Sequence, residues 1–311
     1  MLRQSDIFFS SPGTPSMKNI IALTDSELLQ KASSQPPTPS VIKLAGIDLN
    51  IYEWGDQAKP GLLFFLGGAA HAGWWSFIAP FFLPEYHCIA IDLSGHGDSA
   101  RRPKYSPEFW REEVLQVAAS ESFFDSTPVI IGHSMGGLIG IRAAAVLGTA
   151  LPGLVIIDSA ARPDNINHGR RRKSVNLLGK LRTYESRQQI LSRFRLVPPQ
   201  DCQNTNILQY IAAESIRSTD DGWTWKYDPQ AFRDLLSASI FSLLKEISCP
   251  TLIIRGQGSR ILDRDTAESM RSELKQACDI VEIADANHHV MLDQPVRLIE
   301  ETKQALRKWN Y

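Results

Sequence analysis

Short aliphatic runs recur along the chain, and most of them are followed by Gly, Asp or Asn. Such runs, with no alternation between apolar and polar positions, are typical of strands buried on both faces, as in a parallel sheet. Amphipathic stretches with helical spacing lie between several of them, and this alternation predicts a doubly wound, mostly parallel α/β fold. The predicted strands cover 62–66, 88–91, 129–131, 154–157, 251–254 and 280–283, and the predicted helices cover 106–119, 135–148, 266–277 and 295–309.

The first part of the chain has a different texture. Residues 1–40 are rich in Ser, Pro and Thr, which predicts an irregular N-terminal arm that buries little surface, with a short helix near 25–32. From residue 41 to residue 54, apolar and polar positions alternate on both sides of Gly46, a pattern that suggests two antiparallel strands. The globular part of the protein is therefore expected to begin at residue 41.

One interval interrupts the rhythm of strands and helices. Between Asp158 and Thr251 no buried strand is evident, and the interval is too long for an ordinary connection. It contains several amphipathic stretches with helical spacing. We therefore expect a core domain formed by 41–160 and 248–311, into which a helical cap at 161–247 is inserted.

Composition and charge exclude several classes of protein. The chain has 33 basic and 34 acidic residues, which argues against nucleic-acid binding by phosphate neutralisation. No apolar run reaches the roughly 18 residues of a membrane span, and the first residues do not have the pattern of a signal peptide. The four cysteines are far apart with no CxxC pair, which favours reduced thiols over a zinc ribbon or a disulfide framework. We expect a cytoplasmic protein with no nucleic-acid or membrane partner and leave its oligomeric state open.

One serine stands between a predicted buried strand and a predicted helix, in the sequence Gly132-His-Ser-Met-Gly136. The G-x-S-x-G spacing is typical of a strained turn that projects the serine hydroxyl, because glycines on both sides let the chain fold tightly. The helix that follows points free N–H groups at the hydroxyl, where they favour developing negative charge. The pattern predicts that Ser134 is a catalytic nucleophile.

A serine hydroxyl is a poor nucleophile at neutral pH, so a base is required. Among the histidines, His133 is expected to pack beneath the turn, and His96 lies in a turn after the predicted strand at 88–91. His288 and His289 follow the last predicted strand of the sheet. Because neighbouring residues rarely project the same way, one of this pair is expected to be the base and the other to be structural.

Four motifs, taken in order, resemble the α/β-hydrolase superfamily, and the resemblance extends over residues 41–309. They are the LGGAAHAGWW segment at 66–75, the DLSGHGDS segment at 92–99, the serine turn, and a histidine seven residues before Pro295. The resemblance implies that the last of these, His288, is the base. It also implies that the backbone N–H groups of Gly68 and Met135 form an oxyanion hole. This chemistry needs no metal and no organic cofactor, and no phosphate loop or dinucleotide fingerprint is evident.

The acid member departs from the common pattern of the superfamily. Most members have an Asp shortly after strand seven, and here Ser259 stands at that place. A serine cannot stabilise an imidazolium as a carboxylate does. The R-G-x-x-S-x-x-L sequence at 255–262 resembles a subset that takes its acid from strand six, including some amide-cleaving enzymes of small-acid catabolism. This favours Asp158 as the acid, with Asp263 as the alternative.

Residues near the motifs and in the cap allow two interpretations each. Trp74, Trp75 and Trp223 could line an apolar substrate pocket, or they could pack the cap and the loop against the core. Arg162 and the basic run at 170–173 could clamp a substrate carboxylate, or they could form a solvated basic face. In each case the packing or solvated interpretation is favoured.

Together these features predict a capped serine hydrolase that acts on a small molecule. It would cleave an ester, thioester or amide-like bond through an acyl-enzyme on Ser134. Two alternatives stay open. A carbon–carbon bond hydrolase of aromatic breakdown would use the same triad, and a receptor-like member of the fold would bind a ligand with little turnover.

Overall fold

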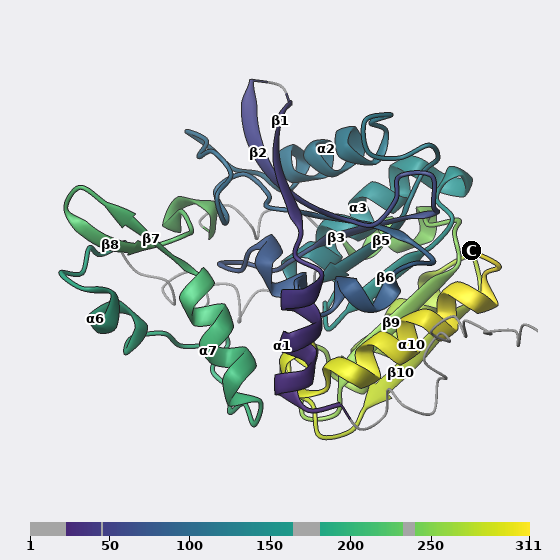
Figure 1. Ribbon diagram of the computed structural model, residues 1–311. Helices are drawn as coiled ribbons and strands as arrows, with labels where there is room; N and C mark the ends of the chain where they lie inside the picture. Colours follow the sequence, from purple (N-terminus) through teal and green to yellow (C-terminus); the bar gives the residue numbers. More distant parts are fainter. Residues whose placement is uncertain (1–22, 45, 164–180, 233–239) are drawn as a thin grey trace, which may run out of the picture.

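The computed structural model describes residues 23–44, 46–163, 181–232 and 240–311. In this part of the chain one large sheet forms the centre of the molecule, with strand order β1-β2-β4-β3-β5-β6-β9-β10 (Figure 1). The pairs β1–β2 and β2–β4 are antiparallel, and all the other neighbours are parallel. The strands are β1 (Thr38–Leu44), β2 (Ile47–Trp54), β3 (Gly61–Phe65), β4 (His87–Ile91), β5 (Val129–His133), β6 (Leu154–Ile157), β9 (Thr251–Gly256) and β10 (Cys278–Ile283).

Helices cover both faces of the sheet, as the alternation of strands and helices predicts (Figure 1). One face carries α2 (Pro107–Ala118), α3 (Met135–Leu147) and α8 (Arg264–Glu273). The opposite face carries α1 (Asp25–Ser34), α9 (Val290–Asp293) and α10 (Pro295–Lys308). The prediction of a mostly parallel α/β fold is therefore confirmed.

The core consists of two hydrophobic clusters, one on each face of the sheet. Successive residues of a strand alternate between them: Leu62 and Phe64 of β3 belong to the first cluster, and Leu63 and Phe65 belong to the second. All four side chains are almost completely buried. This two-sided burial explains why the central strands read as continuous apolar runs. The run at 280–283 is different. It belongs to β10, which lies at the edge of the sheet, and most of the β10 side chains are only partly buried.

The N-terminal region corrects the predicted boundary at residue 40. Helix α1 begins with a capping box, in which Thr24 and Glu27 satisfy each other's backbone N–H groups, and β1 already starts at Thr38. The short helix predicted near 25–32 is thus confirmed as α1, and β1 begins slightly before the predicted start of the globular part. Pro39 and Ser40 are residues of low strand propensity, so the sequence did not indicate a strand at this point. An edge strand tolerates them, because its outer side forms no hydrogen bonds with a neighbouring strand.

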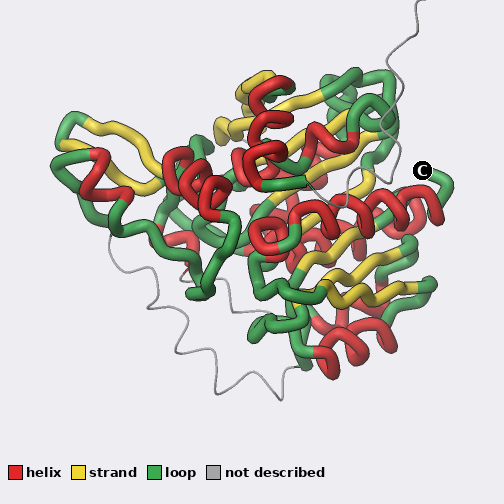
Figure 2. Tube along the Cα trace, turned by 60° about the horizontal axis from the view of Figure 1, so that its bottom comes forward, coloured by secondary structure: helices red, strands yellow, loops and turns green. Residues whose placement is uncertain are grey.

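The region 161–247 was predicted as a helical cap, and part of it is a β-hairpin. The described elements are α6 (Arg187–Leu191), α7 (Thr205–Glu214), β7 (Ile216–Thr219) and β8 (Gly222–Trp225), and β7 pairs with β8. Strands β7 and β8 are too short to show a clear alternation of apolar and polar residues. The amphipathic stretches with helical spacing elsewhere in the region therefore determined the prediction. Figures 1 and 2 show the cap elements to one side of the main sheet, with α1 beside α7. The α1–α7 contact includes a hydrogen bond of 3.1 Å from the backbone N–H of Asn206 to Asp25.

The hairpin is attached to the turn that follows β4. Lys226 forms an ion pair of 2.7 Å with Asp98, and the backbone N–H of Asp228 donates to the carbonyl of Gly95 at 2.7 Å. These contacts join the segment after β8 to the turn at the carboxyl end of β4. Among the residues that the structure describes, none of the helices combines the length and apolar character that a membrane span requires.

Candidate active site

The turn that carries Ser134 lies between the end of β5 and the start of α3. Ser134 has φ 56° and ψ −120°, a conformation that L-residues rarely adopt. A Cβ atom at Gly132 would lie 2.6 Å from the backbone of Gly136, and one at Gly136 would lie 2.7 Å from the carbonyl oxygen of Phe65. Close packing of β5, α3 and β3 therefore requires both glycines of the G-x-S-x-G motif. Ser134 as a residue is partly exposed, so the turn is not completely enclosed by the protein.

Three side chains from distant parts of the chain form a continuous series of hydrogen bonds at the carboxyl edge of the sheet. The Oγ of Ser134 lies 3.0 Å from Nε2 of His288, and Nδ1 of His288 lies 2.9 Å from Oδ1 of Asp158. Because a carboxylate only accepts, Nδ1 carries the proton and Nε2 offers its lone pair to the serine hydroxyl. The structure thus brings together the three residues that were predicted to form a triad. It places His288, and not His289, against the serine.

Asp158 follows β6 and is completely buried, with the unusual φ of 46°. Its Oδ2 accepts a hydrogen bond from the backbone N–H of Gly256 at 2.8 Å, and its Oδ1 also accepts from the hydroxyl of Ser259 at 2.5 Å. These bonds and the one from His288 compensate for the cost of burying a carboxylate. Ser259 was recognised in the sequence only as a residue that could not be the acid. In the structure it supports the acid.

Replacing Ser259 by alanine is expected to lower kcat/KM for ester hydrolysis about tenfold, because one hydrogen bond to a buried carboxylate is lost. The effect is moderate since Asp158 keeps its bonds to Gly256 and His288. Steady-state kinetics on the purified variant provide the measurement. A Ser259→Thr variant keeps the hydroxyl and serves as the matched control, which should retain most of the activity. Equal activity in all three proteins would show that Ser259 does not act on the carboxylate.

Asp263, the alternative acid, has other partners. Its side chain caps the N-terminus of α8 by accepting from the backbone N–H of Thr266 at 2.8 Å, and it pairs with Arg162 at 3.0 Å. Although burial opposes the effect, the hydrogen bond from Thr266 and the contact with Arg162 lower the pKa of Asp263 to about 2. Asp263 is therefore a helix cap, and Asp158 is the carboxylate that contacts His288.

His133 and His289 pack against His288. The ring centroids of His133 and His289 lie 4.7 Å and 4.9 Å from that of His288, and Nε2 of His133 lies 2.9 Å from the carbonyl oxygen of His288. Burial and the neighbouring imidazoles hold the pKa of His133 well below its usual value, and they lower the pKa of His289 to about 3. Both rings are therefore neutral at neutral pH. Of the three imidazoles, His288 is the one whose Nδ1 contacts the carboxylate of Asp158.

The loop after β3 approaches Ser134 closely. A Cβ atom at Gly67 would lie 2.7 Å from Cβ of Ser134, and the backbone N–H of Ala70 donates to the carbonyl of Gly67 at 3.3 Å, which closes a turn. Gly68 lies within this turn. Met135 is the first residue of α3, so its N–H has no acceptor within the helix. The location is consistent with an oxyanion hole formed by Gly68 and Met135, and that role stays a prediction.

A buried carboxylate that the sequence did not single out anchors this loop. Oδ1 of Asp92 accepts from the backbone N–H of Ala72 at 2.5 Å, and Oδ2 accepts from the side chain of Asn50 at 2.8 Å and from the backbone N–H of Asp98 at 2.9 Å. Burial raises the pKa of Asp92 to about 6, against the effect of these hydrogen bonds. The sequence did contain a sign of this residue. Asp92 is the first residue of the DLSGHGDS segment, which was recognised as a family motif, but no role was assigned to Asp92.

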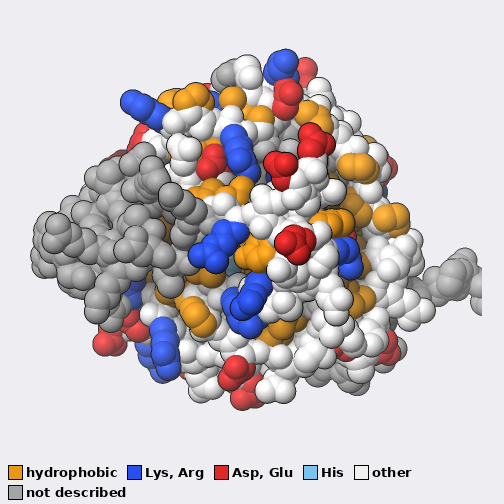
Figure 3. All heavy atoms as spheres, turned by 90° about the vertical axis from the view of Figure 1, so that its left-hand side faces the viewer, with side chains coloured by type: hydrophobic (Ala, Val, Ile, Leu, Met, Phe, Trp, Pro, Cys, Tyr) orange, Lys and Arg blue, Asp and Glu red, His pale blue; other side chains and the backbone are white. Residues whose placement is uncertain are grey.

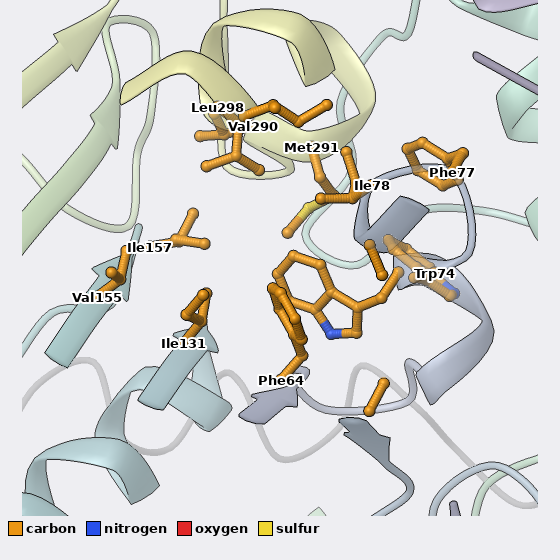
Figure 4. Close-up of a cluster of buried hydrophobic side chains, with 14 of the residues drawn as sticks. Phe64, Trp74, Phe77, Ile78, Ile131, Val155, Ile157, Val290, Met291 and Leu298 are labelled. Atoms are coloured by element: carbon orange, nitrogen blue, oxygen red, sulfur yellow. The ribbon is translucent and has the colours of Figure 1, made fainter. Parts of the chain in front are cut away.

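The three tryptophans differ in their surroundings. Trp75 is 1% exposed, and its ring packs on Phe64 with centroids 5.0 Å apart, so it belongs to the core and does not line an open pocket. Trp74 is also buried, with its ring centroid 5.6 Å from that of His289, and Figure 4 shows it in the hydrophobic cluster with Phe64. Trp223 is part of the β7–β8 hairpin. Packing therefore accounts for Trp74 and Trp75, because both indoles are buried within the hydrophobic cluster on this face of the sheet.

The basic residues of the cap have several environments. Arg162 donates to the carbonyl of Ile261 and pairs with Asp263, so it is engaged in holding the segment before α8. The basic run at 170–173 lies outside the described residues. Figure 3 views the molecule from the cap side and shows Lys and Arg side chains gathered around hydrophobic ones near the centre of that face. For the basic run, the favoured interpretation as a solvated face and the alternative of a carboxylate clamp both stay open.

The chain is similar to known proteins over most of its length. The sequence model described as "Alpha/beta hydrolase family" matches residues 62–301. Esterase Rv0045c of Mycobacterium tuberculosis is 30% identical over 289 residues, which cover 90% of this chain and 93% of that protein. The enzyme 3-oxoadipate enol-lactonase 1 of Acinetobacter baylyi is 24% identical, and the match covers 82% of this chain and 91% of the relative.

A solved structure extends the comparison to the fold. The crystal structure of E-2-(acetamidomethylene)succinate hydrolase superposes with a TM-score of 0.74 at 18% identity, covering 87% of this chain and 99% of that protein. At this identity the likeness concerns the fold alone. The family match over most of the chain and the similarity to the esterase show the membership directly. The chain belongs to the α/β-hydrolase family.

Proposed function

We propose that this protein is a serine hydrolase that cleaves esters of small carboxylic acids through an acyl-enzyme on Ser134. The observation that carries the proposal is the pair of hydrogen bonds, 3.0 Å and 2.9 Å, that link Ser134 through His288 to Asp158. The similarity to an esterase and to an enol-lactonase supports an ester-type bond. Thioesters and amide-like bonds would react by the same route.

In the first half of the reaction, Nε2 of His288 takes the proton of the Ser134 hydroxyl while Oγ attacks the carbonyl carbon. Asp158 stabilises the resulting imidazolium through Nδ1. The backbone N–H groups of Gly68 and Met135 donate to the oxygen that becomes negative in the tetrahedral intermediate. When the carbon–oxygen bond to the leaving group breaks, the proton on Nε2 passes to the departing alkoxide.

The second half of the reaction repeats these roles with water. Nε2 of His288 takes a proton from water, and the hydroxide attacks the acyl carbon bonded to Oγ of Ser134. The bond to Oγ then breaks, and Oγ regains its proton from His288. The carboxylic acid leaves, and the enzyme returns to its starting state. The partial exposure of Ser134 is consistent with access for water.

The proposed function is tested by a fluorophosphonate probe together with a panel of substrates. We expect stoichiometric labelling at Ser134, and hydrolysis of p-nitrophenyl esters from acetate to decanoate with a chain-length optimum that reveals the acyl pocket. The matched anilides report on amide cleavage. A vinylogous 1,5-diketone acid reports on carbon–carbon cleavage by the same triad.

Each part of the panel separates the proposal from its alternatives. Cleavage of the diketone acid without ester hydrolysis would assign the protein to the carbon–carbon hydrolases. Tight binding of an ester analogue without turnover would assign it to the receptor-like members of the fold. A folded protein that neither reacts with the probe nor hydrolyses any ester contradicts the proposed function.

A further inference from the structure

Three imidazoles meet behind the nucleophile, and the proposed hydrolysis uses one of them. One nitrogen from each ring of His133, His288 and His289 can be chosen so that these atoms all lie within 4.8 Å of one another. The side chains come from two places, the end of β5 and the loop before α9. Each of the three residues is at most 4% exposed. Clusters of this kind are the usual ligands of transition-metal ions in proteins.

The hydrogen bonds of the rings leave lone pairs without a partner. Nε2 of His133 faces the carbonyl oxygen of His288, so it must carry the proton, and the bare nitrogen of that ring, Nδ1, is buried without a hydrogen bond. The ring of His289 lies beside the backbone carbonyl of Pro198, yet neither of its nitrogens makes a hydrogen bond of normal geometry. A neutral imidazole always has one bare nitrogen, so His289 offers a lone pair in either tautomer.

Unpartnered buried polar atoms are costly, and a structure that retains them needs a reason. Packing alone would be served better by apolar side chains of similar shape at positions 133 and 289. Trp74 already provides an aromatic neighbour to the ring of His289. Two bare imidazole nitrogens, one on His133 and one on His289, therefore lie beside the His288 ring and point to a ligand that accepts nitrogen lone pairs.

We propose that His133, His288 and His289 form an inhibitory site for a divalent transition-metal ion such as Zn²⁺. The consequence for catalysis rests on the proposed function, whereas the binding site does not. Zinc prefers imidazole nitrogens at about 2.0–2.1 Å in tetrahedral geometry, which separates two ligand nitrogens by roughly 3.4 Å. The largest separation here must therefore shrink, and small rotations of the rings can supply this because no strong hydrogen bond fixes the His289 ring.

Binding of the ion would inhibit hydrolysis in a specific way. His288 can donate a lone pair to a metal or accept the proton of Ser134, but it cannot do both with one nitrogen. An ion held by the three rings therefore removes the base from the nucleophile. The partly exposed Ser134 beside His288 marks the side from which the ion can enter. A hard cation such as Mg²⁺ is excluded, since it prefers oxygen ligands.

The test measures metal binding apart from activity. Zn²⁺ is titrated into the full-length protein with a chromophoric chelator as competitor, and Co²⁺ is used to record the visible absorption of a four-coordinate ion. Wild type is compared with His289→Phe, which keeps a planar ring without a ligand, and with His289→Gln in case the first variant folds poorly. His87→Gln is the matched control, since His87 is a buried histidine that pairs with Glu53 at 2.9 Å, away from the cluster.

We expect one Zn²⁺ per wild-type and His87→Gln chain, and binding at least about tenfold weaker in both His289 variants, because one of three protein ligands is lost. Zn²⁺ should also slow fluorophosphonate labelling of Ser134 in wild type, with each variant compared with its own chelator-treated state. Unchanged Zn²⁺ affinity in both His289 variants, or no binding by wild type, overturns the proposal. Zinc binding through His289 in a protein that hydrolyses nothing would refute the proposed function and leave this site standing.

Discussion

Replacing Ser134 by alanine is expected to abolish ester hydrolysis and fluorophosphonate labelling without loss of the fold. The hydroxyl is the atom that forms the acyl-enzyme, so no other group can take over its role. Removal of a triad nucleophile costs on the order of 10⁴- to 10⁶-fold in kcat, and the remaining rate comes from binding and the oxyanion hole. The turn itself should persist, because Gly132 and Gly136 provide the close packing that holds residue 134 in its strained conformation.

The measurement is kcat on the best ester of the panel, with circular dichroism to check the fold. Ser159→Ala is the matched control. Ser159 is a buried serine that follows Asp158 in the chain, and its hydroxyl donates to the carbonyl of Ile157 at 3.0 Å rather than to a side chain of the triad. This control should stay within about threefold of wild type, since surrounding bonds are little changed. An active Ser134→Ala enzyme would mean that the chemistry takes place elsewhere.

Replacing Asp158 by asparagine is the second change with a large expected effect, a loss of about 10⁴-fold in kcat. The carboxylate accepts three hydrogen bonds, from His288, Gly256 and Ser259. An amide has one acceptor oxygen, and its NH₂ group would meet an N–H group or a hydroxyl that also needs an acceptor. If the NH₂ group of the asparagine faces Nδ1 of His288, it favours the tautomer whose proton sits on Nε2, and this proton blocks deprotonation of Ser134.

Asp263→Asn provides the comparison that decides between the two carboxylates. It should keep near-wild-type kcat and lose about 1 kcal/mol of stability at most, because it weakens a helix cap and an exposed ion pair. Both enzymes are assayed for kcat and for thermal unfolding. The assignment of the acid would be reversed if Asp263→Asn lost most of its kcat while Asp158→Asn kept a kcat near that of wild type.

The sequence was most informative where the chemistry depends on local geometry. The turn around Ser134 could be predicted because a strand, a tight bend and a helix place steric demands on consecutive residues, and glycine meets them at Gly132 and Gly136. The central strands were equally clear, since burial on both faces leaves a continuous apolar run. The edge strands β1 and β10 were predicted over part of their length and the hairpin β7–β8 was not predicted, because the side chains of these strands are only partly covered.

Assignments that depend on distant residues stayed open at the level of sequence. The pair His288 and His289 could be resolved only by its family spacing, and the acid only by resemblance to a subset of the superfamily. The tertiary structure resolves both by contact, because the tips of β6 and β9 bring Asp158, Gly256 and Ser259 together beside one ring of the pair. Only the tertiary structure shows that the hydroxyl of Ser259 donates a hydrogen bond to Asp158.

The amino-acid sequence by itself therefore determined the layered α/β architecture, the candidate nucleophile and the region that supplies the candidate base. Each of these depends on periodicity or on steric limits within a few residues of the chain. Only the tertiary structure decided which carboxylate faces the imidazole, that Trp75 belongs to the core, and that His133 and His289 share a buried cluster with His288. These are relations between side chains far apart in sequence, and their positions follow from how the strands are ordered in the sheet.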